Sequence, residues 1–442
     1  MSILFKNALI VTMNERREVF TGQVYVEGDR IVEINGSRDR ADKVVDATGQ
    51  ALIPGLIQPH IHLCQTVMRG CADDMELLDW LKLRIWPLEG AHDADSIYYS
   101  ALLGCGELFQ GGTTAIIDME TVHHTESALQ AITDCGMRAM AGKVMMDWGR
   151  SVPQSLLEDT DSSVRESVRL LERWHNTAGG RLQYAFSPRF VVSCTEELLV
   201  KVRDLSRHYE VKVHTHASEN RGEISLVERE RGMQNIRYLE HLGLTGPRLV
   251  LAHCIHVDES ELNILAASGT KVVHCPSSNL KLGSGIAPIP KMLEKGVDVS
   301  IAADGAPCNN NLDMFHEMRL AALIQKPNYG PTAMPAKKVF EMATLGGAKA
   351  MGLEDELGSI EVGKKADLAL VSLAGLHNSP AHAVDIYAQL VYQLKSNDVL
   401  LTMVDGRVVW EGGKLHSINS QEVKLQSHRA IAKLCQRAGI RL

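Results

Sequence analysis

Short apolar runs alternate with longer helix-like segments between residues 56 and 355. This alternation is typical of β/α units that wind around a parallel sheet. The eight runs are GLIQPHIHL (55–63), TAIIDME (114–120), AMAGKVMMD (139–147), LQYAFSPRF (182–190), VKVHTHASE (211–219), RLVLAHCIH (248–256), TKVVHCPSSN (270–279) and VSIAADG (299–305). Eight units in a region of this size match a (β/α)8 barrel, so we predict an α/β fold with a TIM barrel over residues 56–355.

The two ends of the chain lack this pattern and are rich in short strands. Near the N-terminus, apolar residues flank Gly28-Asp29, which is a hairpin signal. Strand signals return after the barrel region, and residues 420–437 are predicted to form a closing helix. We therefore predict that the N- and C-terminal segments, residues 1–55 and 356–442, fold together as a small β-sandwich domain beside the barrel.

One connection in the barrel region is longer than the others. Residues 64–113 exceed what a single crossover needs, so we predict an inserted loop and an extra helix there. Because such an insertion could pack against a second copy of the chain, we expect a homo-oligomer.

Composition excludes several classes of protein. The formal net charge of −8 leaves no basic footprint for nucleic acid. No run of 18 apolar residues exists, so we expect no membrane span. The N-terminal residues lack the features of a signal peptide, and the nine cysteines never occur as C-x-x-C. We therefore predict a cytoplasmic protein with free thiols and without a thiolate zinc site.

Residues that can bind a metal gather at the ends of the predicted strands. The first run ends in His60 and His62, the fifth includes His216, and the eighth ends at Asp304. In a barrel the carboxyl ends of all strands meet at one mouth, so these residues become neighbours. His60 and His62 are two positions apart and share one face of a strand. The pattern predicts a catalytic divalent metal site with an open position for water.

Two further histidines near these ends have open interpretations. His214 could point the same way as His216, or it could lie behind the ligands or in the core. His274, in the seventh run, is interpreted as a packing residue or as a group behind the ligands. The chain has no H-E-x-x-H, Walker A, nucleophile elbow or dinucleotide-binding motif, which excludes several other chemistries.

The sequence resembles the amidohydrolase superfamily over essentially its whole length. Within that superfamily it is similar to the branch that holds adenosine-type deaminases, guanine deaminases and triazine hydrolases. The matching motifs are Pro54–His62, Met68–Gly70, the segment from Trp80 to Glu89, His216–Glu219, His253-Cys254, Ser278–Leu282, Asp304–Ala306 and Asn309–Asn311.

The resemblance implies roles for individual residues. It implies that His60, His62, His216 and Asp304 bind one metal ion, with Zn²⁺ expected and Fe²⁺ as the alternative. It further implies that His253 hydrogen-bonds the metal water and that Glu219 shuttles a proton. Members with two metals use a carboxylated lysine at the end of the fourth strand. Here that strand ends in Arg189, which cannot form a carbamate, so a single metal is expected.

The resemblance also suggests residues that contact the substrate. Glu89 is expected to accept hydrogen bonds from ribose hydroxyls. Arg189, within Pro-Arg-Phe, resembles guanine deaminases, which leaves the identity of the ring open. Trp80 either closes over the ring or anchors a helix. Arg150 either reaches a charged tail of the substrate or lies solvated in a loop.

These expectations lead to a predicted activity on a small heteroaromatic amine. We predict a hydrolytic deaminase that removes the exocyclic amine of an adenosine-type nucleoside, namely 5'-deoxyadenosine, 5'-methylthioadenosine, S-adenosylhomocysteine or adenosine, with release of ammonia. The alternatives are a guanine or pterin deaminase and an s-triazine chlorohydrolase or aminohydrolase. A non-catalytic scaffold is disfavoured because His60, His62, His216, Glu219, His253 and Asp304 are all intact.

Overall fold

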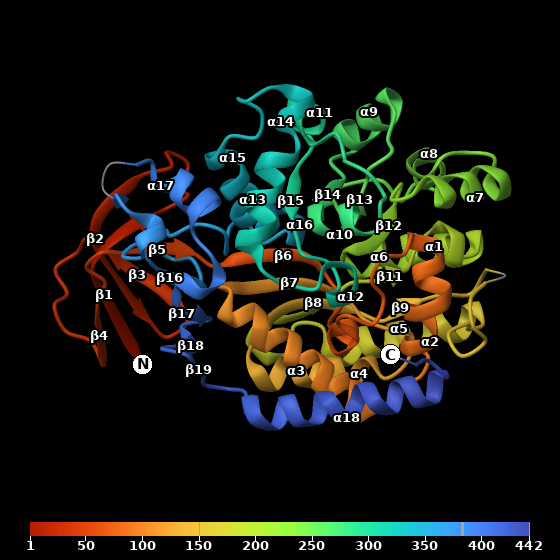
Figure 1. Cartoon of the computed structure of the whole chain (residues 1–442), viewed down its shortest axis with the longest axis horizontal. Coiled ribbons are helices and arrows are strands. Elements are labelled where there is room, and N and C mark those ends of the chain that lie inside the picture. The colour runs from red at the N-terminus through yellow and green to blue at the C-terminus, as the bar shows by residue number, and fades with distance from the viewer. Residues whose placement is uncertain (150, 382–383, 442) are drawn as a thin grey trace.

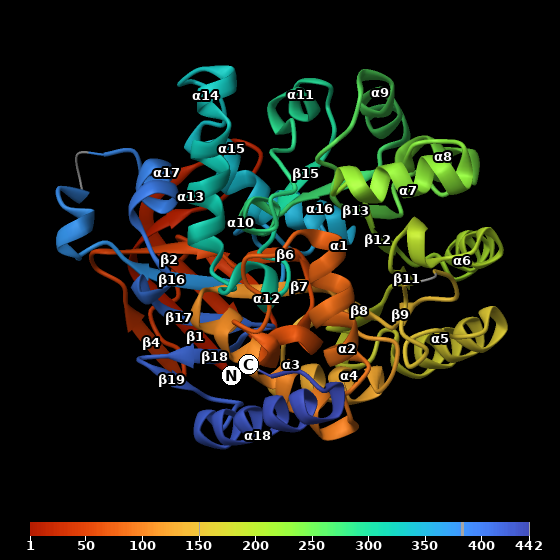
Figure 2. The same ribbon diagram turned by 45° about the vertical axis from the view of Figure 1, so that its right-hand side comes forward.

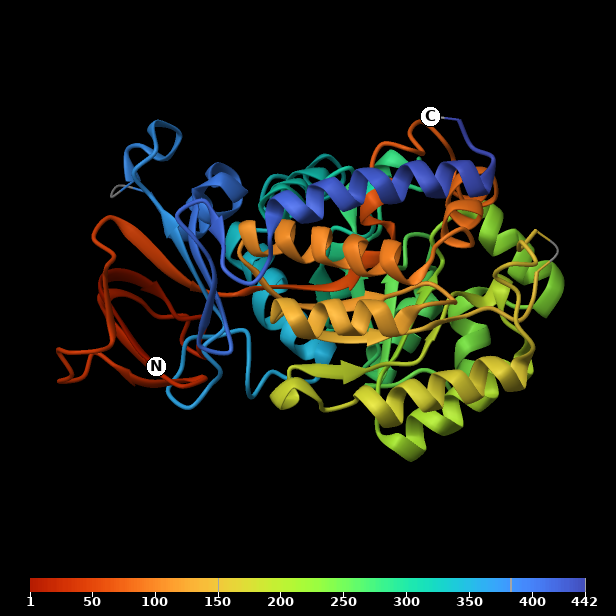
Figure 3. The same cartoon turned by 90° about the horizontal axis from the view of Figure 1, so that it is seen from below.

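The computed structural model describes residues 1–149, 151–381 and 384–441. It consists of a sheet built from both ends of the chain and a larger part in which strands and helices alternate (Figure 1). Seen from below, the two parts lie side by side along the long axis of the molecule (Figure 3).

Each of the eight predicted runs contains a strand, which confirms the α/β class. Their side chains are almost entirely buried, as expected for parallel strands that are covered on both faces. These strands are β6 (Leu56–Ile61), β7 (Thr113–Met119), β8 (Arg138–Gly142), β10 (Leu182–Tyr184), β12 (Val213–Ala217), β13 (Leu249–His253), β14 (Lys271–His274) and β15 (Val299–Ile301). They form two four-stranded parallel sheets, in the orders β10-β8-β7-β6 and β12-β13-β14-β15.

Hydrogen bonds join the two parallel sheets at both of their edges. Beyond β10, Phe186 forms a parallel bridge with Val213, and Phe190 forms one with His216 of β12. At the other edge, the Asp304 amide after β15 donates to the His60 carbonyl of β6 over 3.2 Å. The carboxyl ends of all eight strands therefore face the same side of the molecule.

Two predicted runs are each divided into two strands. The third run contains β8 and the short β9 (Val144–Met145), and the fourth contains β10 and β11 (Ser187–Pro188), with β9 and β11 paired to each other. The break follows Gly142, where a Cβ atom would lie 1.9 Å from the carbonyl oxygen of Ala185. Only glycine allows the two backbones to approach this closely.

Helices lie outside the parallel strands (Figure 2). The longer ones are α3 (Ala94–Gln110), α4 (Thr125–Cys135), α5 (Thr160–Trp174), α6 (Glu196–Tyr209), α7 (Arg221–Arg231), α8 (Asn235–His241), α9 (Glu259–Ser268), α10 (Pro276–Lys281), α11 (Ile289–Glu294), α13 (Met314–Ile324) and α15 (Ala336–Glu341). Shorter helices and helical turns are η3 (Ala178–Gly180), η4 (Val191–Ser193), α12 (Ala306–Asn309), α14 (Lys326–Tyr329), η5 (Met342–Gly346), α16 (Gly347–Met351), η6 (Leu376–Asn378), α17 (Ile386–Ala388), η8 (Gln389–Gln393) and η9 (Ser396–Asp398).

The long connection at residues 64–113 has the extra helical structure that the sequence predicts. It holds η1 (Leu63–Met68), α1 (Leu77–Trp80), the π-helix η2 (Leu81–Ile85) and α2 (Trp86–Glu89), and it ends in α3. The elements α1, η2 and α2 follow one another without a break and lie over the strand ends (Figure 2).

Strands from both termini form one nine-stranded mixed sheet. The strands are β1 (Ser2–Val11), β2 (Val19–Glu27), β3 (Arg30–Ile34), β4 (Lys43–Asp46), β5 (Gln50–Pro54), β16 (Leu368–Ser372), β17 (Val399–Val404), β18 (Arg407–Glu411) and β19 (Lys414–Leu415). Their order is β19-β18-β17-β16-β5-β1-β2-β3, and β4 pairs with β1. The hairpin predicted around Gly28-Asp29 is confirmed, because Glu27 pairs with Arg30.

The predicted closing helix is present as α18 (Ser420–Ala438). It packs against α3, α2 and η1 of the larger part and runs alongside α3 (Figure 3). All nine cysteines are free and buried, as the sequence predicts. Within the described residues, no helix has both the length and the hydropathy needed to cross a membrane.

Candidate active site

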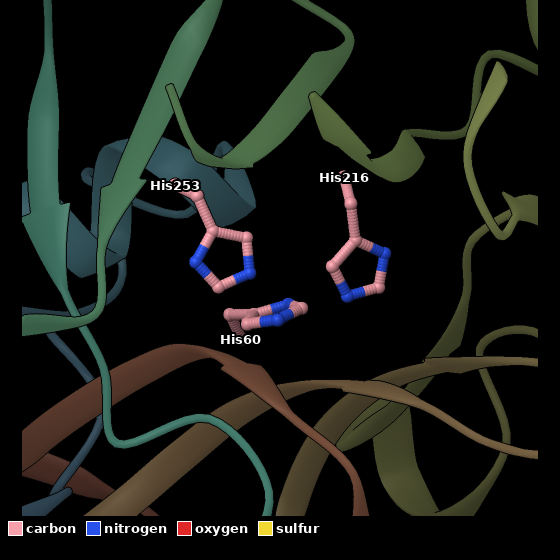
Figure 4. A group of neighbouring side chains, drawn as sticks. All are labelled: His60, His216 and His253. Atoms are coloured by element: carbon pink, nitrogen blue, oxygen red, sulfur yellow. The ribbon is translucent and has the colours of Figure 1, made fainter. Parts of the chain in front are cut away.

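Four of the residues predicted to bind metal meet at the carboxyl ends of the strands. His60 lies on β6, His62 follows it, His216 lies on β12, and Asp304 follows β15. The Nε2 atoms of His62 and His216 are 3.3 Å apart. Asp304 Oδ1 lies 3.3 Å from His60 Nε2 and 3.4 Å from His62 Nε2. His253 of β13 joins the group, and the rings of His60, His216 and His253 face a common space (Figure 4).

The imidazoles of His60, His62 and His216 each have a hydrogen-bond partner at Nδ1, on the side of the ring away from the other ligand candidates. His62 donates to the Met119 carbonyl and His216 to the Arg189 carbonyl, both over 2.8 Å. His60 Nδ1 lies 2.8 Å from Nε2 of His214, so His214 supports a ligand candidate from behind. Protons on Nδ1 leave the Nε2 lone pairs aimed at one point, which is the arrangement found around protein-bound metals.

The donor set fits a single divalent ion. Ligands about 2.0–2.1 Å from a tetrahedral ion are about 3.3 Å apart, close to the separations between these nitrogens and the carboxylate. His60 Nε2 is buried and has no hydrogen-bond partner among the described residues. Burial lowers the pKa of His62 to about 3, so its ring is neutral at physiological pH and can bind a cation. Imidazole and carboxylate ligands suit Zn²⁺ or Fe²⁺.

Glu219 and His253 lie next to this donor set. His253 Nε2 is 3.6 Å from Glu219 Oε2 and 3.8 Å from Asp304 Oδ2. Burial raises the pKa of Glu219 to about 7. Burial by itself would lower the pKa of His253, but the nearby carboxylates of Glu219 and Asp304 outweigh burial and raise this pKa. His253 Nδ1 donates to Asn279 Oδ1 over 2.8 Å, which turns Nε2 toward the two carboxylates.

The backbone turns sharply where these side chains are placed. Ser218, His253 and Asp304 have φ angles of 54°, 74° and 66°. This left-handed conformation is unfavourable for residues other than glycine and occurs most often at functional sites. Helix α7 begins at Arg221 with Asn220 as its N-cap, and Glu223 of that helix accepts a hydrogen bond from the Glu219 amide over 2.8 Å. The helix cap therefore fixes the backbone that carries Glu219.

The cavity above these residues is small. Its volume is about 20 Å³, which is room for about one water molecule. His62, His216, Glu219, His253 and Asp304 line its floor. Its walls are formed by Gln65, Leu77, Trp80, Leu81, Arg189, Phe190 and Leu282.

The residues predicted to contact substrate have different positions. Trp80 and Arg189 line the cavity. Glu89 is buried behind Arg189, and its carboxylate oxygens accept hydrogen bonds from Arg189 Nη1 over 2.6 Å and Nη2 over 3.2 Å. Gln65 Nε2 also donates to Glu89, over 2.8 Å. Arg150 lies outside the described residues.

The structure adds residues that the sequence did not single out. Gln65 lines the cavity three residues after His62, and its buried Oε1 atom has no hydrogen-bond partner among the residues that the structure describes. Asp118 and Glu120, at the end of β7, are fully buried, and Asp118 Oδ1 accepts a hydrogen bond from the Leu63 amide over 2.9 Å. Burial raises the pKa of Asp118 to about 7, and burial together with the Asp118 carboxylate raises the pKa of Glu120. The available sequence signal for Gln65 was its place three residues after the ligand candidate His62, in what the structure shows to be η1.

Comparisons with known proteins agree with this geometry. Residues 51–409 match the model of the amidohydrolase family. A 5'-deoxyadenosine deaminase of Methanothermobacter thermautotrophicus is 39% identical over 93% of this chain and 95% of its own length. A 5-methylthioadenosine/S-adenosylhomocysteine deaminase of Desulforudis audaxviator is 38% identical over 99% of this chain and 100% of its own. A zinc-bound adenosine deaminase structure from Xanthomonas campestris has a TM-score of 0.92 and 30% identity, with 98% of each chain covered.

Proposed function

Because the chain belongs to the amidohydrolase family, we propose that it is a hydrolytic deaminase of adenosine-type nucleosides. The candidate substrates are 5'-deoxyadenosine, 5'-methylthioadenosine, S-adenosylhomocysteine and adenosine. The observation that carries the proposal is the meeting of the His60, His62 and His216 imidazoles with Asp304, beside Glu219, at the carboxyl ends of the strands. Full-length relatives named for these activities support the choice of substrate class.

We also infer the finer architecture. The backbone hydrogen bonds that join the two four-stranded parallel sheets at both of their edges support a closed (β/α)8 barrel over residues 56–355. The single terminal sheet, folded around its own apolar core, supports a small β-sandwich domain from residues 1–55 and 356–442. A homo-oligomer and a cytoplasmic location stay predictions, and size-exclusion chromatography with light scattering tests the first.

His60, His62, His216 and Asp304 would hold one ion, Zn²⁺ in first place and Fe²⁺ in second. When bound, the ion would supply Lewis acidity that lowers the pKa of a water molecule to about 7. A second ion is not proposed, because Arg189 stands at the end of the fourth strand, where a carboxylated lysine would be needed.

The remaining steps belong to the side chains. Asp304 Oδ2 accepts a proton from the attacking water, which adds to the ring carbon that carries the amine. Glu219, protonated near neutral pH, gives its proton to the adjacent ring nitrogen and then helps to return a proton to the departing ammonia. His253 stabilises the charge that develops on the new oxygen. One water is consumed, the carbon–nitrogen bond breaks, and a ring carbonyl and ammonia are formed.

A panel of substrates tests the proposal. Purified protein loaded with Zn²⁺ is incubated with the four nucleosides, guanine, a pterin and an s-triazine, while ultraviolet absorption and ammonia are measured. We expect loss of the adenine absorption band together with one ammonia per nucleoside. Turnover of guanine without turnover of any adenosine-type nucleoside would replace this proposal with a guanine-type deaminase, for which Arg189 in the cavity offers donors to a ring oxygen.

Replacing Glu219 tests the mechanism. Glu219→Gln removes the proton that the side chain carries but keeps its size, so kcat should fall about 10²–10⁴-fold. Metal content, measured by mass spectrometry, should stay at the wild-type value, since Glu219 is outside the proposed ligand set. Glu228→Gln, an exposed position on α7, serves as the control and should have wild-type kcat. Wild-type turnover by Glu219→Gln would remove Glu219 from the mechanism.

A further inference from the structure

The cavity beside Glu219 and His253 is too small for the substrates considered above. Its volume of about 20 Å³ admits about one water molecule. Pockets that bind molecules of drug or nucleoside size typically have volumes of about 300–1,000 Å³. Part of the wall must therefore move before a nucleoside can reach Glu219 and His253.

The walls differ in how firmly they are held. The floor and one side come from the ends of β12, β13 and β15, which belong to hydrogen-bonded parallel sheets. Leu77, Trp80 and Leu81 come instead from α1 and the π-helix η2, outside any sheet. A π-helix within α-helical structure is uncommon and often marks a functional site.

Hydrogen bonds hold the residues on both sides of segment 74–88. In the part of the chain that the structure describes, the side chains of the segment itself make no such contacts. Just before it, Asp73 accepts hydrogen bonds from Lys281 and Asn310. Just after it, Glu89 is held by Arg189 and Gln65. Within the described part of the chain, residues 74–88 make no side-chain hydrogen bond and no salt bridge to the rest of the protein.

Apolar packing alone holds the segment down. Leu77, Trp80, Ile85 and Trp86 are buried in a cluster with Phe190, Leu282 and the end of α18. Contacts of this kind are non-directional, so they can break and reform without leaving a polar group unpaired. The left-handed backbone at Asp74, with φ of 56°, provides a bend at the start of the segment.

Trp80 carries an unused hydrogen-bond donor at the cavity. Its side chain is 4% exposed and lines the cavity, and its Nε1 atom has no acceptor among the described residues. A buried donor without an acceptor is costly, and buried indole N–H groups usually have a partner. A nucleoside in the cavity would offer ring nitrogens and sugar oxygens as acceptors.

We infer that residues 74–88 form a movable cover, which opens to admit the nucleoside and closes with the indole N–H of Trp80 donating to it. The donor half of this inference rests on the proposed function. The movement half does not, because it follows from the size of the cavity and from the way the segment is held.

Hydrogen exchange of the free, zinc-loaded protein tests the movement. The chain contains a matched control, since α15, η5 and α16 also form an α–π–α succession. That control segment is held by side-chain contacts such as Arg17 to Glu341. We expect amides of residues 77–88 to exchange at least about tenfold faster than those of residues 336–351, as in a local opening. Equal or slower exchange in the cover would overturn the inference, whatever substrate the protein uses.

Two tryptophans of the same segment test the donor. Trp80→Phe keeps an aromatic ring but removes the N–H, and we expect kcat/KM to fall about tenfold, mainly through KM. Trp86→Phe is the matched control, because the Trp86 Nε1 atom is also buried with no acceptor in the described part of the chain, but Trp86 does not line the cavity. Its kcat/KM should stay within about twofold of the wild type.

Equal effects of the two substitutions, or none from Trp80→Phe, would overturn the donor role. Thermal unfolding of both variants verifies that each is folded during the assay. A wild-type protein that turns over no nucleoside would count against the proposed function, while the exchange comparison would still decide whether the cover moves.

Discussion

At the scale of single residues, the groups behind the proposed ligands matter as much as the ligands. The Met119 carbonyl, the Arg189 carbonyl and His214 each hold the Nδ1 side of one imidazole. These contacts fix which nitrogen of each ring carries the proton. Since a metal needs the unprotonated nitrogen, the supporting groups determine metal affinity together with the ligands.

Replacing His214 tests this dependence. His214→Phe keeps a buried ring but removes the group that accepts from His60 Nδ1, so Zn²⁺ affinity should fall about 10–100-fold. Competition with a chromophoric chelator measures the change. His274→Phe is a suitable control, because His274 is also buried near the site but has no hydrogen-bond partner among the described residues. An unchanged affinity in His214→Phe would show that His60 needs no support from it.

The sequence singled out ligand candidates that the structure brings together, but it did not single out most of the groups around them. His60, His62, His216 and Asp304 could be identified because strand ends converge in any parallel barrel. Asn279, which orients His253, and the carboxyl groups of Asp118 and Glu120 also lie at the ends of predicted runs, but the sequence assigned them no role. Their roles depend on which side chains the folded chain brings into contact, and this is not encoded in spacing along the sequence.

At the scale of elements, the cover and α3 meet at a helix cap. Asp93 caps α3 by accepting from the Ser96 amide over 2.8 Å, and it also contacts Arg437 of α18 over 2.6 Å. Partial burial by itself would raise the pKa of Asp93, but hydrogen bonds from the Ser96 amide and the Arg437 guanidinium outweigh burial and lower this pKa. The cap thereby fixes the start of the packed helix α3, a short distance along the chain after the end of the cover.

Substitutions at Asp93 should separate capping from charge. Asp93→Ala should lower the free energy of unfolding by about 1 kcal/mol at neutral pH, whereas Asp93→Asn should cost only a few tenths, because asparagine also caps. Since the folded pKa is below the unfolded value, the stabilisation is present above about pH 4 and is lost as the pH falls. Denaturant titrations at pH 7 and at low pH measure this. Equal losses at both pH values would contradict a role for the ionised carboxylate.

Element positions followed from the sequence more readily than element boundaries. All eight strand runs were found, since each is a buried stretch between helical segments. The division of two runs into β8 with β9 and β10 with β11 was not predicted. It depends on the approach of the Ala185 carbonyl to Gly142, a contact between residues that are far apart in the sequence.

At the scale of the whole molecule, a buried ion network joins the terminal sheet to the parallel strands. Arg138 at the start of β8 contacts Asp367 over 2.7 Å and Asp405 over 2.9 Å. The side chains of Arg138 and Asp367 are only 5% and 4% exposed, so neither charge can be solvated if its partner is lost. The network lies at the amino end of the strand, on the side away from the candidate active site.

Breaking this network should weaken the whole molecule without changing the chemistry. Arg138→Met leaves buried carboxylates unpaired, so the free energy of unfolding should fall by about 3–5 kcal/mol. The control is Arg17→Met, which removes a contact with Glu341 between the same two parts, where the side chains are 21% and 26% exposed and the expected cost is about 1 kcal/mol or less. Denaturant titration measures both, and kcat at low temperature should stay unchanged, because the folded fraction retains its site. Similar losses in the two variants would mean that solvent reaches the Arg138 network, and that apolar packing, rather than this network, holds the two parts together.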